Sequence, residues 1–373
     1  MAVNATTYSG KQFAVYLASE TTTGTFNTTD ANYRRVDVEG ITLPTFNPQQ
    51  EFEMRTGSTR IAEFDQVFSS TKRVMTEFTL SGRLTQEMWV ILCENATGEE
   101  FDGGTGIDSV LTLDGSYSGQ NFKVGTDPAS ATDYGHLLSV YFAAPTAADS
   151  YSLKSCVVTN FSIDADMDSA AGRFNYSATF QTQSTPAKGE QSGLIAASTA
   201  IGTNFLYLSL WDERALNIEN YDGSTDQDTT PLIKTFNFTI DNPTQFLGAT
   251  GTNGEPEVWA KALPELSVTY GGSVKYDTET DKMVEAFRDP SSASFLVLYL
   301  ADVPVDTSVD TPANEFFNTA SGGSSVKFGM WAGKSKLTSC EVSSDDVAMV
   351  NFEAKVLAPS SGNTLHLLGG DNV

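Results

Sequence analysis

The sequence SLKSCVV at residues 152–158 is nearly repeated as KLTSCEV at residues 336–342. Each of these two stretches contains one of the three cysteines of the chain, Cys93, Cys156 and Cys340. Three cysteines cannot all be paired within one chain, and their spacing matches no zinc-binding pattern. We therefore interpret them as reduced, mostly buried thiols, and we interpret the two stretches as equivalent strands of a duplicated unit.

Other pairs of segments follow in the same order in the two halves of the chain, as a duplication requires. Most of them alternate apolar and polar residues, which is typical of half-buried strands. The matched segments, in chain order, are ITLPTFNPQQEF (41–52) with FNFTIDNPTQFL (236–247), TEFTLSGRL (76–84) with PELSVTYGG (264–272), TQEMWVILCENATG (85–98) with TDKMVEAFRDP (280–290), LLSVYFA (137–143) with FLVLYLA (295–301), and FNYSATFQTQSTP (174–186) with VNFEAKVLAPSSG (350–362).

The third pair is the helix-like stretch of each half, with Thr85 and Thr280 as the expected N-caps. The sequence thus predicts a mainly β protein made of two tandem, similar β-sandwich or partial-barrel domains, each with one flanking α-helix. We place the domains at residues 1–190 and 191–373, with a linker near 184–204. Two segments rich in small polar residues, about 99–135 and about 303–328, are interpreted as insertions.

The composition excludes several classes of function. The 373 residues contain 22 Lys and Arg against 47 Asp and Glu, for a net charge of −25. No cluster of basic residues is present that would neutralise phosphates, so specific nucleic-acid binding is not expected. No apolar run approaches the ~20 residues that span a bilayer. The first residues, MAVNATTYSGKQF, lack the pattern of a secretory signal, so we expect neither export nor membrane anchoring.

Candidate catalytic and metal-binding residues are few. The chain has two histidines, His136 and His366, and neither lies in sequence near a plausible nucleophile. The stretch DADMDS (164–169) resembles the start of a calcium loop, but the glycine and glutamate that such a loop needs are replaced by Ser169 and Asn175. We interpret DADMDS as a polar turn between strands. The sequence therefore predicts no enzyme activity, no cofactor and no metal site.

The order of strand, long loop and strand (EFEMRTGSTRIAEFDQVFSSTKRVMTEFTLSGRL, 51–84), followed by one short helix (TQEMWVILCEN, 85–95) and further strands, resembles the tail tube proteins of tailed bacteriophages. The resemblance covers both halves and rests on the order of elements. It implies domains that join their sheets around a DNA channel. Since the usual member has one domain, the duplication resembles the subset that forms trimeric rings with pseudo-sixfold symmetry.

The resemblance also implies partners and a location. The chain would bind copies of itself in homotrimeric rings stacked into a tube, together with a tape-measure protein and tube-end proteins. DNA would pass through without specific binding, and an acidic channel would repel it. The protein would belong to the virion tail and assemble in the host cytoplasm, with the two insertions on the outside of the tube.

Two sets of residues are the expected assembly sites under this resemblance. Segments 49–73 and 244–262 occupy the place of the ring-stacking loop, although packing on their own domain is an equal alternative for them. The polar residues of two matched strands would face the channel or a neighbouring domain. The stacking candidates are Met54, Arg55, Ile61, Phe64 and Phe68, and the strand-face candidates are Glu77, Thr79, Ser81, Glu265, Ser267 and Thr269.

A second class of function fits the same composition. Tandem β-sandwiches rich in Thr, Ser, Asn and Gly are also typical of secreted or surface adhesins and layer proteins, although the missing signal sequence and the free cysteines count against this alternative. A β enzyme acting on glycans would need a defined pair of carboxylates, and the many acidic residues here single out no pair.

Overall fold

The computed structural model describes residues 13–21, 24–29, 32–42, 44, 49–52, 67–70, 76–97, 109–113, 121–124, 137–182, 186–188, 207–210, 213–221, 228–229, 232–242, 244–250, 256–262, 266–278, 280–289, 293–301, 326–332, 335–343, 347–357 and 365–369. The predicted domain boundary at 190/191 and most of the predicted linker lie outside these residues. The described part is mainly β and contains two α-helices, one in each half of the chain, as the sequence predicts.

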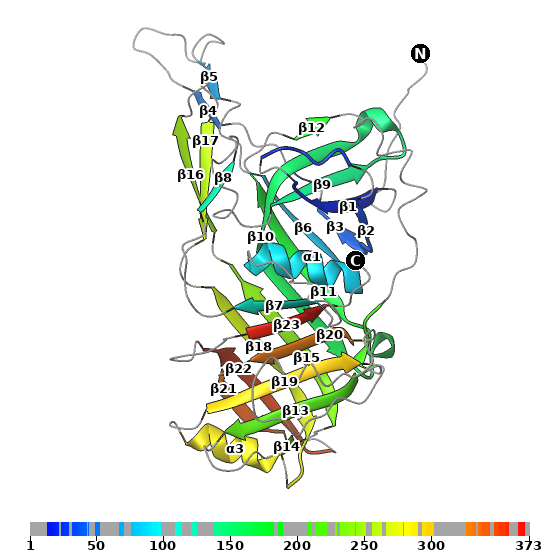
Figure 1. Ribbon diagram of the computed structural model, residues 1–373, viewed down its shortest axis with the longest axis vertical. Helices are drawn as coiled ribbons and strands as arrows, with labels where there is room; N and C mark the ends of the chain where they lie inside the picture. Colours follow the sequence, from blue (N-terminus) through cyan, green and yellow to red (C-terminus); the bar gives the residue numbers. More distant parts are fainter. Residues whose placement is uncertain are drawn as a thin grey trace.

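The first half contains one helix within a set of antiparallel strands (Figure 1). Its elements are β1 (Ala14–Ser19), β2 (Arg34–Val36), β3 (Gly40–Ile41), β4 (Gln49–Phe52), β5 (Val67–Ser70), β6 (Thr76–Arg83), α1 (Gln86–Thr97), β7 (Ser109–Leu113), β8 (Asn121–Val124), β9 (Leu138–Ala143), β10 (Tyr151–Asp166), β11 (Asn175–Thr182) and β12 (Ala187–Lys188).

The second half follows the same plan. Its elements are β13 (Glu213–Tyr221), β14 (Asp228–Thr229), β15 (Ile233–Asp241), β16 (Thr244–Thr250), β17 (Pro256–Ala262), β18 (Ser267–Lys275), α3 (Asp281–Arg288), β19 (Ala293–Ala301), β20 (Val326–Ala332), β21 (Ser335–Val342), β22 (Met349–Val356) and β23 (Leu365–Gly369).

The two halves are alike in how their strands pair, which confirms the predicted fold class. In the first half, neighbouring strands follow the path β2-β1-β9-β10-β11-β6-β3. In the second half, the path is β14-β13-β19-β21-β22-β18-β15. Each strand of the first path has its counterpart at the same place in the second path and in the same chain order, and each half has its helix between equivalent strands.

The register of the matched strands differs from the register that the sequence suggested. Leu80 on β6 lies opposite Ala178, and Tyr270 on β18 lies opposite Ala354, so Leu80 and Tyr270 occupy equivalent positions. Matching Glu77 with Glu265 was therefore wrong by two residues. The alternating pattern has a period of two, so a shift by two residues leaves the apolar and polar faces unchanged and cannot be detected from the pattern.

The two cysteine stretches lie in equivalent strands, β10 and β21, but the cysteines are not at equivalent positions. Cys340 lies opposite Phe352 of β22. The counterpart of Phe352 on β11 is Tyr176, and the residue of β10 opposite Tyr176 is Ile163. Ile163 is therefore the counterpart of Cys340. Cys156 lies earlier in β10, beside β9. The similarity of the two stretches is thus not a positional match, although the duplication to which it pointed is present. All three cysteines are buried and unpaired, as expected.

Strand β10 is the longest strand and belongs to two sheets. Its first residues pair with β9 and β12, and its later residues pair with β11 and β15. The change of sheet falls near Ser155, which has a φ of 53°, in the left-handed region that non-glycine residues seldom adopt. This kink lets one strand form part of both layers of the first-half sandwich.

The pairing of β10 with β15 joins the two halves into one continuous sheet. Across this sheet the strand order is β3-β6-β11-β10-β15-β18-β22-β21, and all neighbours are antiparallel. The first half supplies the first four strands, and the second half supplies the counterparts of the same four in the same order. Figure 1 shows β10 running from the upper half of the molecule toward β15 and β18 in the lower half.

The core lies between this sheet and the elements packed on its apolar face. Phe78 on β6 stacks on Phe180 of β11 and meets Phe142 of β9 edge-on, with ring centroids 4.9 and 5.4 Å apart. Helix α1 lies over the junction of the two halves, because the Trp89 ring contacts both Phe161 of β10 and Phe238 of β15.

Both helices start where the sequence predicts, directly after Thr85 and Thr280, but only Thr85 makes the expected capping hydrogen bond. In α1 the Thr85 hydroxyl accepts a hydrogen bond from the Met88 backbone N–H at 3.4 Å, as an N-cap should. Thr280 precedes α3 but makes no such bond. Its hydroxyl donates to the Lys275 carbonyl at 2.9 Å and accepts from the Asp277 N–H at 2.8 Å, so it closes the turn before the helix.

Both segments that were assigned to the place of the ring-stacking loop contain paired strands. Strands β4 and β5 form one hairpin within 49–73, and β16 and β17 form the other within 244–262. The insertion at 99–135 contains β7 and β8, which pair with β23 and β17 of the second half. This insertion therefore links the two halves.

Candidate functional site

The outward face of the continuous sheet is covered by polar side chains, most of them short. Inward residues of the same strands are buried, so the alternation is strict along β6, β11 and β22. The outward residues, strand by strand, are Glu77, Thr79, Ser81 and Arg83 (β6); Asn175, Ser177, Thr179 and Gln181 (β11); Asn160, Ser162, Asp164 and Asp166 (β10); Thr235, Asn237, Thr239 and Asp241 (β15); Ser267, Thr269, Gly271, Ser273 and Lys275 (β18); Met349, Asn351, Glu353 and Lys355 (β22); and Lys336, Ser339 and Glu341 (β21).

One row across this polar face consists of hydroxyl groups alone. It crosses five neighbouring strands and both halves of the chain. Its members, each opposite the next, are Ser81, Ser177, Ser162, Thr239 and Thr269. Beside this row, the Thr79 and Thr179 hydroxyls lie 3.2 Å apart. Such side chains are short and neutral, so the middle of the polar face is flat and uncharged.

The polar face carries little net charge. Its side chains include six acidic and four basic residues, for a balance of −2 where the whole chain has −25. The acidic residues are Glu77, Asp164, Asp166, Asp241, Glu341 and Glu353, and the basic residues are Arg83, Lys275, Lys336 and Lys355. The acidic surplus of the chain is therefore not concentrated on this face.

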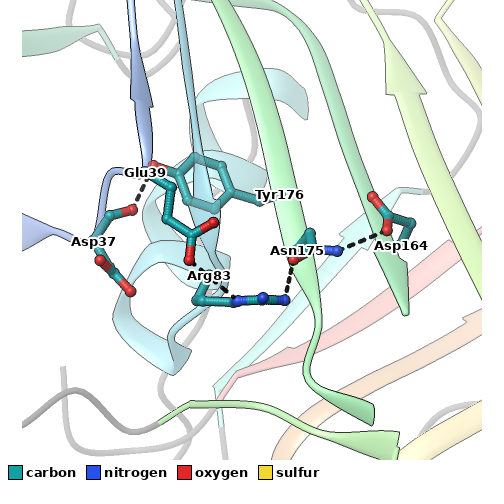
Figure 2. Close-up of polar contacts among 6 residues, drawn as sticks. All are labelled: Asp37, Glu39, Arg83, Asp164, Asn175 and Tyr176. Carbon is teal, nitrogen blue, oxygen red and sulfur yellow. Dashed lines mark hydrogen bonds and ion pairs between the residues drawn. The ribbon is translucent and has the colours of Figure 1, made fainter. Parts of the chain in front are cut away.

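A chain of polar contacts fixes several of these charges in the first half (Figure 2). The Arg83 guanidinium lies 3.5 Å from the Glu39 carboxylate and donates to the Asn175 amide oxygen, and Asn175 Nδ2 donates to Asp164 at 2.9 Å. These contacts cross β6, β11 and β10 in succession. In the second half the equivalent contact is smaller, with Ser273 donating to Asn351.

Tyr176 lies on the inward side of the same strands. Its hydroxyl donates to the Asp37 carbonyl at 2.9 Å, which ties the segment between β2 and β3 to the sheet (Figure 2). Burial raises the pKa of the Tyr176 hydroxyl well above its ordinary value, so this group stays a neutral donor at any physiological pH.

The continuous sheet ends in two edge strands of different kinds. Within the described part of the chain, β3 pairs with β6 alone. Strand β21 pairs with β22 along its length and touches β19 only at Ser335. Strand β21 is the counterpart of β10, and β3 is the counterpart of β15. The two free edges, β21 and β3, are thus the counterparts of β10 and β15, the two strands that pair at the internal junction.

The side chains near the edge of β21 are more exposed than their counterparts at the internal junction. Ala165 on β10 is 3% exposed, whereas the equivalent Val342 on β21 is 44% exposed. Leu92 on α1 is 0% exposed, whereas its counterpart Phe287 on α3 is 41% exposed. The first half therefore has a surface, at Ala165 and Leu92, that is buried at the junction with the second half. The equivalent surface of the second half, at Val342 and Phe287, is exposed.

The structure brings together the predicted strand-face residues that it describes. Glu77, Thr79, Ser81, Ser267 and Thr269 all lie on the polar face. Glu265, Met54, Arg55, Ile61 and Phe64 lie outside the described residues, and Phe68 lies in β5, where its backbone pairs with Glu51.

Sequence reasoning missed the residues that the polar face gains from β10, β11 and β15. The signal was present, because those strands alternate as clearly as β6, but nothing in the sequence indicates that β10 and β15 are neighbours. The DADMDS stretch was interpreted as a turn, and the structure shows this for its second half only. Asp164 and Asp166 belong to the end of β10, and the turn follows at residues 167–169, where the Asp168 N–H bonds the Asp166 carboxylate at 2.9 Å.

In the described ranges, no group of three or more His, Cys, Asp or Glu side chains is placed to hold a metal ion. Neither α1 nor α3 is long and apolar enough to cross a membrane, among the residues that were described. His136 lies outside those residues, and the backbone of His366 pairs with Trp331 and Thr112.

No protein-family model and no curated protein sequence matches this chain.

Proposed function

We propose that this protein assembles with copies of itself, edge to edge, into closed rings that stack to form a tube. The observation that carries the proposal is the repetition of a four-strand unit within one sheet. The last strand of the first unit, β10, pairs with the first strand of the second unit, β15. The same pairing between β21 of one copy and β3 of the next would continue the sheet by the same rule.

The exposed residues at the β21 end support this pairing. A heterologous contact between unlike edges closes into a ring when the rotation per unit divides a full turn. Val342 and Phe287 are open in the single chain, and their counterparts at the internal junction are buried. A neighbouring copy placed as the second half is placed on the first would cover both residues.

Three copies with two units each would form a ring of pseudo-sixfold symmetry. Such a ring would hold 24 strands of the continuous sheet, and at a strand spacing of ~4.8 Å its backbone would be ~37 Å across before any strand tilt. Helix α1 packs on the apolar face of the sheet, so the polar face is the one available to line a channel. Hydroxyl and amide side chains with little net charge would then surround whatever passes through.

Together with the resemblance of the chain to tail tube proteins, this arrangement supports a role as the tail tube of a bacteriophage, with DNA passing through the channel unbound. The polar face has no cluster of Lys and Arg that would hold phosphates. Its near-neutral charge also revises the expectation of an acidic channel, since passage without sticking would rest on short uncharged side chains more than on repulsion. A tape-measure protein and tube-end proteins are the partners that such a tube would require, and the virion tail, assembled in the host cytoplasm, is its expected location.

The two hairpins β4–β5 and β16–β17 are the proposed contacts between stacked rings. Both lie toward the upper left of Figure 1, away from α3 and β14. They occupy equivalent places, each between the counterparts β3 and β6 or β15 and β18. An adhesin or layer protein is the alternative class. Such a protein would present these hairpins to a foreign surface. That function does not require the two free sheet edges, β21 and β3, to be able to pair with each other.

Negative-stain electron microscopy and light scattering of the purified chain test the proposal, and a variant at Val342 makes the test specific. The Ser343 N–H bonds the Met349 carbonyl on β22, so by the alternation of an antiparallel ladder the Val342 N–H points to the free edge. Val342→Pro removes that donor and leaves the bonds to β22 in place. We expect rings or tubes for the wild-type chain and for Val342→Thr, and monomers for Val342→Pro.

The opposite results would overturn the proposal. A wild-type chain that stays monomeric at high concentration excludes ring assembly. Tubes that form equally well from Val342→Pro, with its fold confirmed by circular dichroism, would show that the β21 edge is not the contact.

A further inference from the structure

The register in which β21 of one copy would pair with β3 of the next is not set by the alternation of these strands. A shift by two residues keeps the polar and the apolar faces on their own sides of the sheet, so pairings two residues apart would bury the same faces. A side chain on one edge that fits a space on the other edge would distinguish them. The internal junction of β10 with β15 shows which positions to compare, because it is the same pairing made within one chain.

The first of these positions is Glu341, an exposed residue of β21. Asp164 of β10 lies opposite Asn175 of β11, and Glu341 lies opposite Asn351 of β22. Both asparagines directly precede the aromatic residue that is matched between β11 and β22. Glu341 is therefore the counterpart of Asp164, and its carboxylate is carried on a side chain that is longer by one methylene group.

The second position is Gly40, on the edge strand β3. Asn237 of β15 lies opposite Gly271 of β18, and Gly40 lies opposite Ser81 of β6. Ser81 and Gly271 are matched, because each directly precedes the glycine that lies opposite the matched aromatic residue of the next strand. Gly40 is therefore the counterpart of Asn237.

The internal pairing indicates which residues would meet between copies. Within the chain, Asp164 lies opposite Asn237. The hydrogen-bonded pairs of this ladder fall on odd-numbered residues of β10, so these two residues form a non-hydrogen-bonded pair, in which Cβ atoms lie ~4.5–5.5 Å apart. The same pairing between copies places Glu341 opposite Gly40 on the polar face.

A glycine and the side chain that lies over it have changed places between the two junctions. At the internal junction the side chain is on β15, where Asn237 Oδ1 lies 3.3 Å from the position that a Cβ of Gly271 would take. At the β3 edge the side chain is on β6, where Ser81 Oγ lies 2.6 Å from the position that a Cβ of Gly40 would take. The polar group that faces the arriving strand thus lies one strand further from the edge at β3 than at β15.

We infer that Glu341 of one copy reaches across Gly40 of the next copy and accepts a hydrogen bond from its Ser81 hydroxyl. This contact sets the register of the ring junction, and the inference rests on the edge-to-edge assembly proposed above. Its basis is a match of lengths, because the longer carboxylate, Glu341 in place of Asp164, belongs to the strand whose polar target is further away. After a shift by two residues, Glu341 would instead meet the branched side chain of Thr42.

Disulfide trapping between two differently substituted chains tests the register. In the inferred register Ser339 lies opposite Thr42, because their counterparts Ser162 and Thr239 lie opposite each other. One preparation carries Ser339→Cys and the other carries Thr42→Cys, and we expect a cross-linked pair after mixing and mild oxidation. The matched control replaces Thr42→Cys with Pro44→Cys. That position is the diagonal one, ~7–8 Å away, which is too far for a disulfide. Each single variant alone controls for the native cysteines, which are buried.

Variants of Glu341 test the contact itself. Glu341→Asp keeps the charge but shortens the side chain, so we expect about tenfold weaker association of the copies, whereas Glu341→Gln keeps the length and an acceptor and should stay within about threefold of wild type. Ser81→Ala should weaken association as much as Glu341→Asp, and the two losses should not add. Glu353→Asp shortens an exposed acidic side chain of the same face away from the edge and should associate like wild type. Light scattering measures association, and circular dichroism confirms the fold of each variant.

The outcomes separate this inference from the proposed function. Rings or tubes without the cross-link between residues 339 and 42, or with equal cross-linking to Pro44→Cys, would overturn the register and leave the ring in place. Wild-type association of Glu341→Asp, or additive losses with Ser81→Ala, would overturn the contact. Cross-linked pairs that never close into rings would support the register and count against the tube. Chains that do not associate at all would overturn both.

Discussion

Gly82 and Gly272 occupy the same position in the two halves and have the same physical reason to be glycine. Each lies opposite an aromatic residue of the next strand, Tyr176 or Phe352. A Cβ at Gly82 would lie 2.3 Å from the Asp37 carbonyl oxygen, and a Cβ at Gly272 would lie 2.1 Å from the Thr235 carbonyl oxygen. The close approach of a neighbouring backbone excludes a side chain at both positions, and the aromatic ring covers the bare strand.

Replacing Gly272 with alanine should therefore destabilise the protein. Backbone must move to admit the Cβ, and overpacking of this kind costs about 1–3 kcal/mol. Urea unfolding followed by circular dichroism measures the change, with Gly329→Ala on β20 as a glycine for comparison. A free energy of unfolding unchanged in Gly272→Ala would show that the sheet yields at this point without cost.

Glu20 is a largely buried carboxylate at the kink of β10. Its oxygens accept hydrogen bonds from the Ser155 and Gly24 backbone N–H groups at 2.5 and 2.7 Å, and the Ser139 hydroxyl lies 3.5 Å away. Burial raises the pKa of Glu20 to about 7, against the lowering effect of these hydrogen bonds and of the Lys154 charge. Glu20 thus holds Ser155, whose backbone is in the left-handed region, in place, and it titrates near neutral pH.

This pKa predicts how stability depends on pH. A carboxyl whose pKa is higher in the folded state binds its proton more tightly when folded, so its contribution falls as pH rises from about 4.5 to about 7 and is constant above. The fall amounts to about 3 kcal/mol at most. Glu20→Gln removes the titration, so the difference in unfolding free energy between variant and wild type should shift in favour of the variant across this range. Parallel curves for the two proteins, in denaturant titrations from pH 4.5 to 8, would contradict the assignment.

Among the elements, helix α1 supports the strand on which the two halves meet. The Asn95 side chain is buried beside the kink of β10, where it accepts from the Val158 N–H at 2.5 Å and donates to the Cys156 carbonyl at 3.3 Å. Two backbone groups that leave the ladder at the kink thereby find partners. The second half needs no such residue, because β21 begins near the equivalent point.

Asn95→Ala should leave both of these backbone groups without their present partner. A buried unsatisfied group costs about 1–3 kcal/mol, so the variant should lose at least that much stability. Thermal unfolding measures it, and Asn237→Ala, an exposed asparagine on β15, should change stability by less than about 0.5 kcal/mol. Equal effects of the two substitutions would show that Asn95 does not support the kink.

The elements also show which parts of the fold were predictable. Alternation placed β6, β11, β18 and β22 and their polar faces, because period two is set by local geometry. It did not indicate that β10 would pair with β15, or that β7 and β8 would pair with β23 and β17, because those contacts join residues far apart in the chain. The hairpins were missed because their sequences, such as QFLGAT and EVWAKA, have no clean alternation. The role of Asn95 could not be predicted, since it depends on a kink in a distant strand.

On the scale of the whole molecule, the two halves share one core. The Trp89 ring lies 5.9 Å from Phe161 and 5.7 Å from Phe238, so one buried side chain contacts strands of both halves. Three strand pairings besides this contact link the halves in the described residues, namely β10–β15, β7–β23 and β8–β17. The two sequence repeats are therefore joined by a shared core as well as by strand pairing.

Trp89→Ala should consequently destabilise both halves together. Removal of a fully buried tryptophan costs about 3–5 kcal/mol, and calorimetry should show one transition shifted to lower temperature. Phe287→Ala, on the equivalent helix α3, should have a much smaller effect in the monomer because that side chain is 41% exposed. Two separate transitions in Trp89→Ala would show that the halves unfold independently.

The pairing of β10 with β15 has a consequence for the kinetics of assembly. Strands within one chain meet at an effective concentration that is set by the connecting segment and is on the order of mM, whatever the number of molecules present. The edges of separate copies meet only at the actual protein concentration. Under the proposed ring, half of the junctions would already exist in each newly folded chain, and three encounters would complete what six separate domains would need six encounters to build. The concentration at which rings close would then depend on the β21 and β3 edges, and substitutions there could change it without disturbing the junction inside the chain.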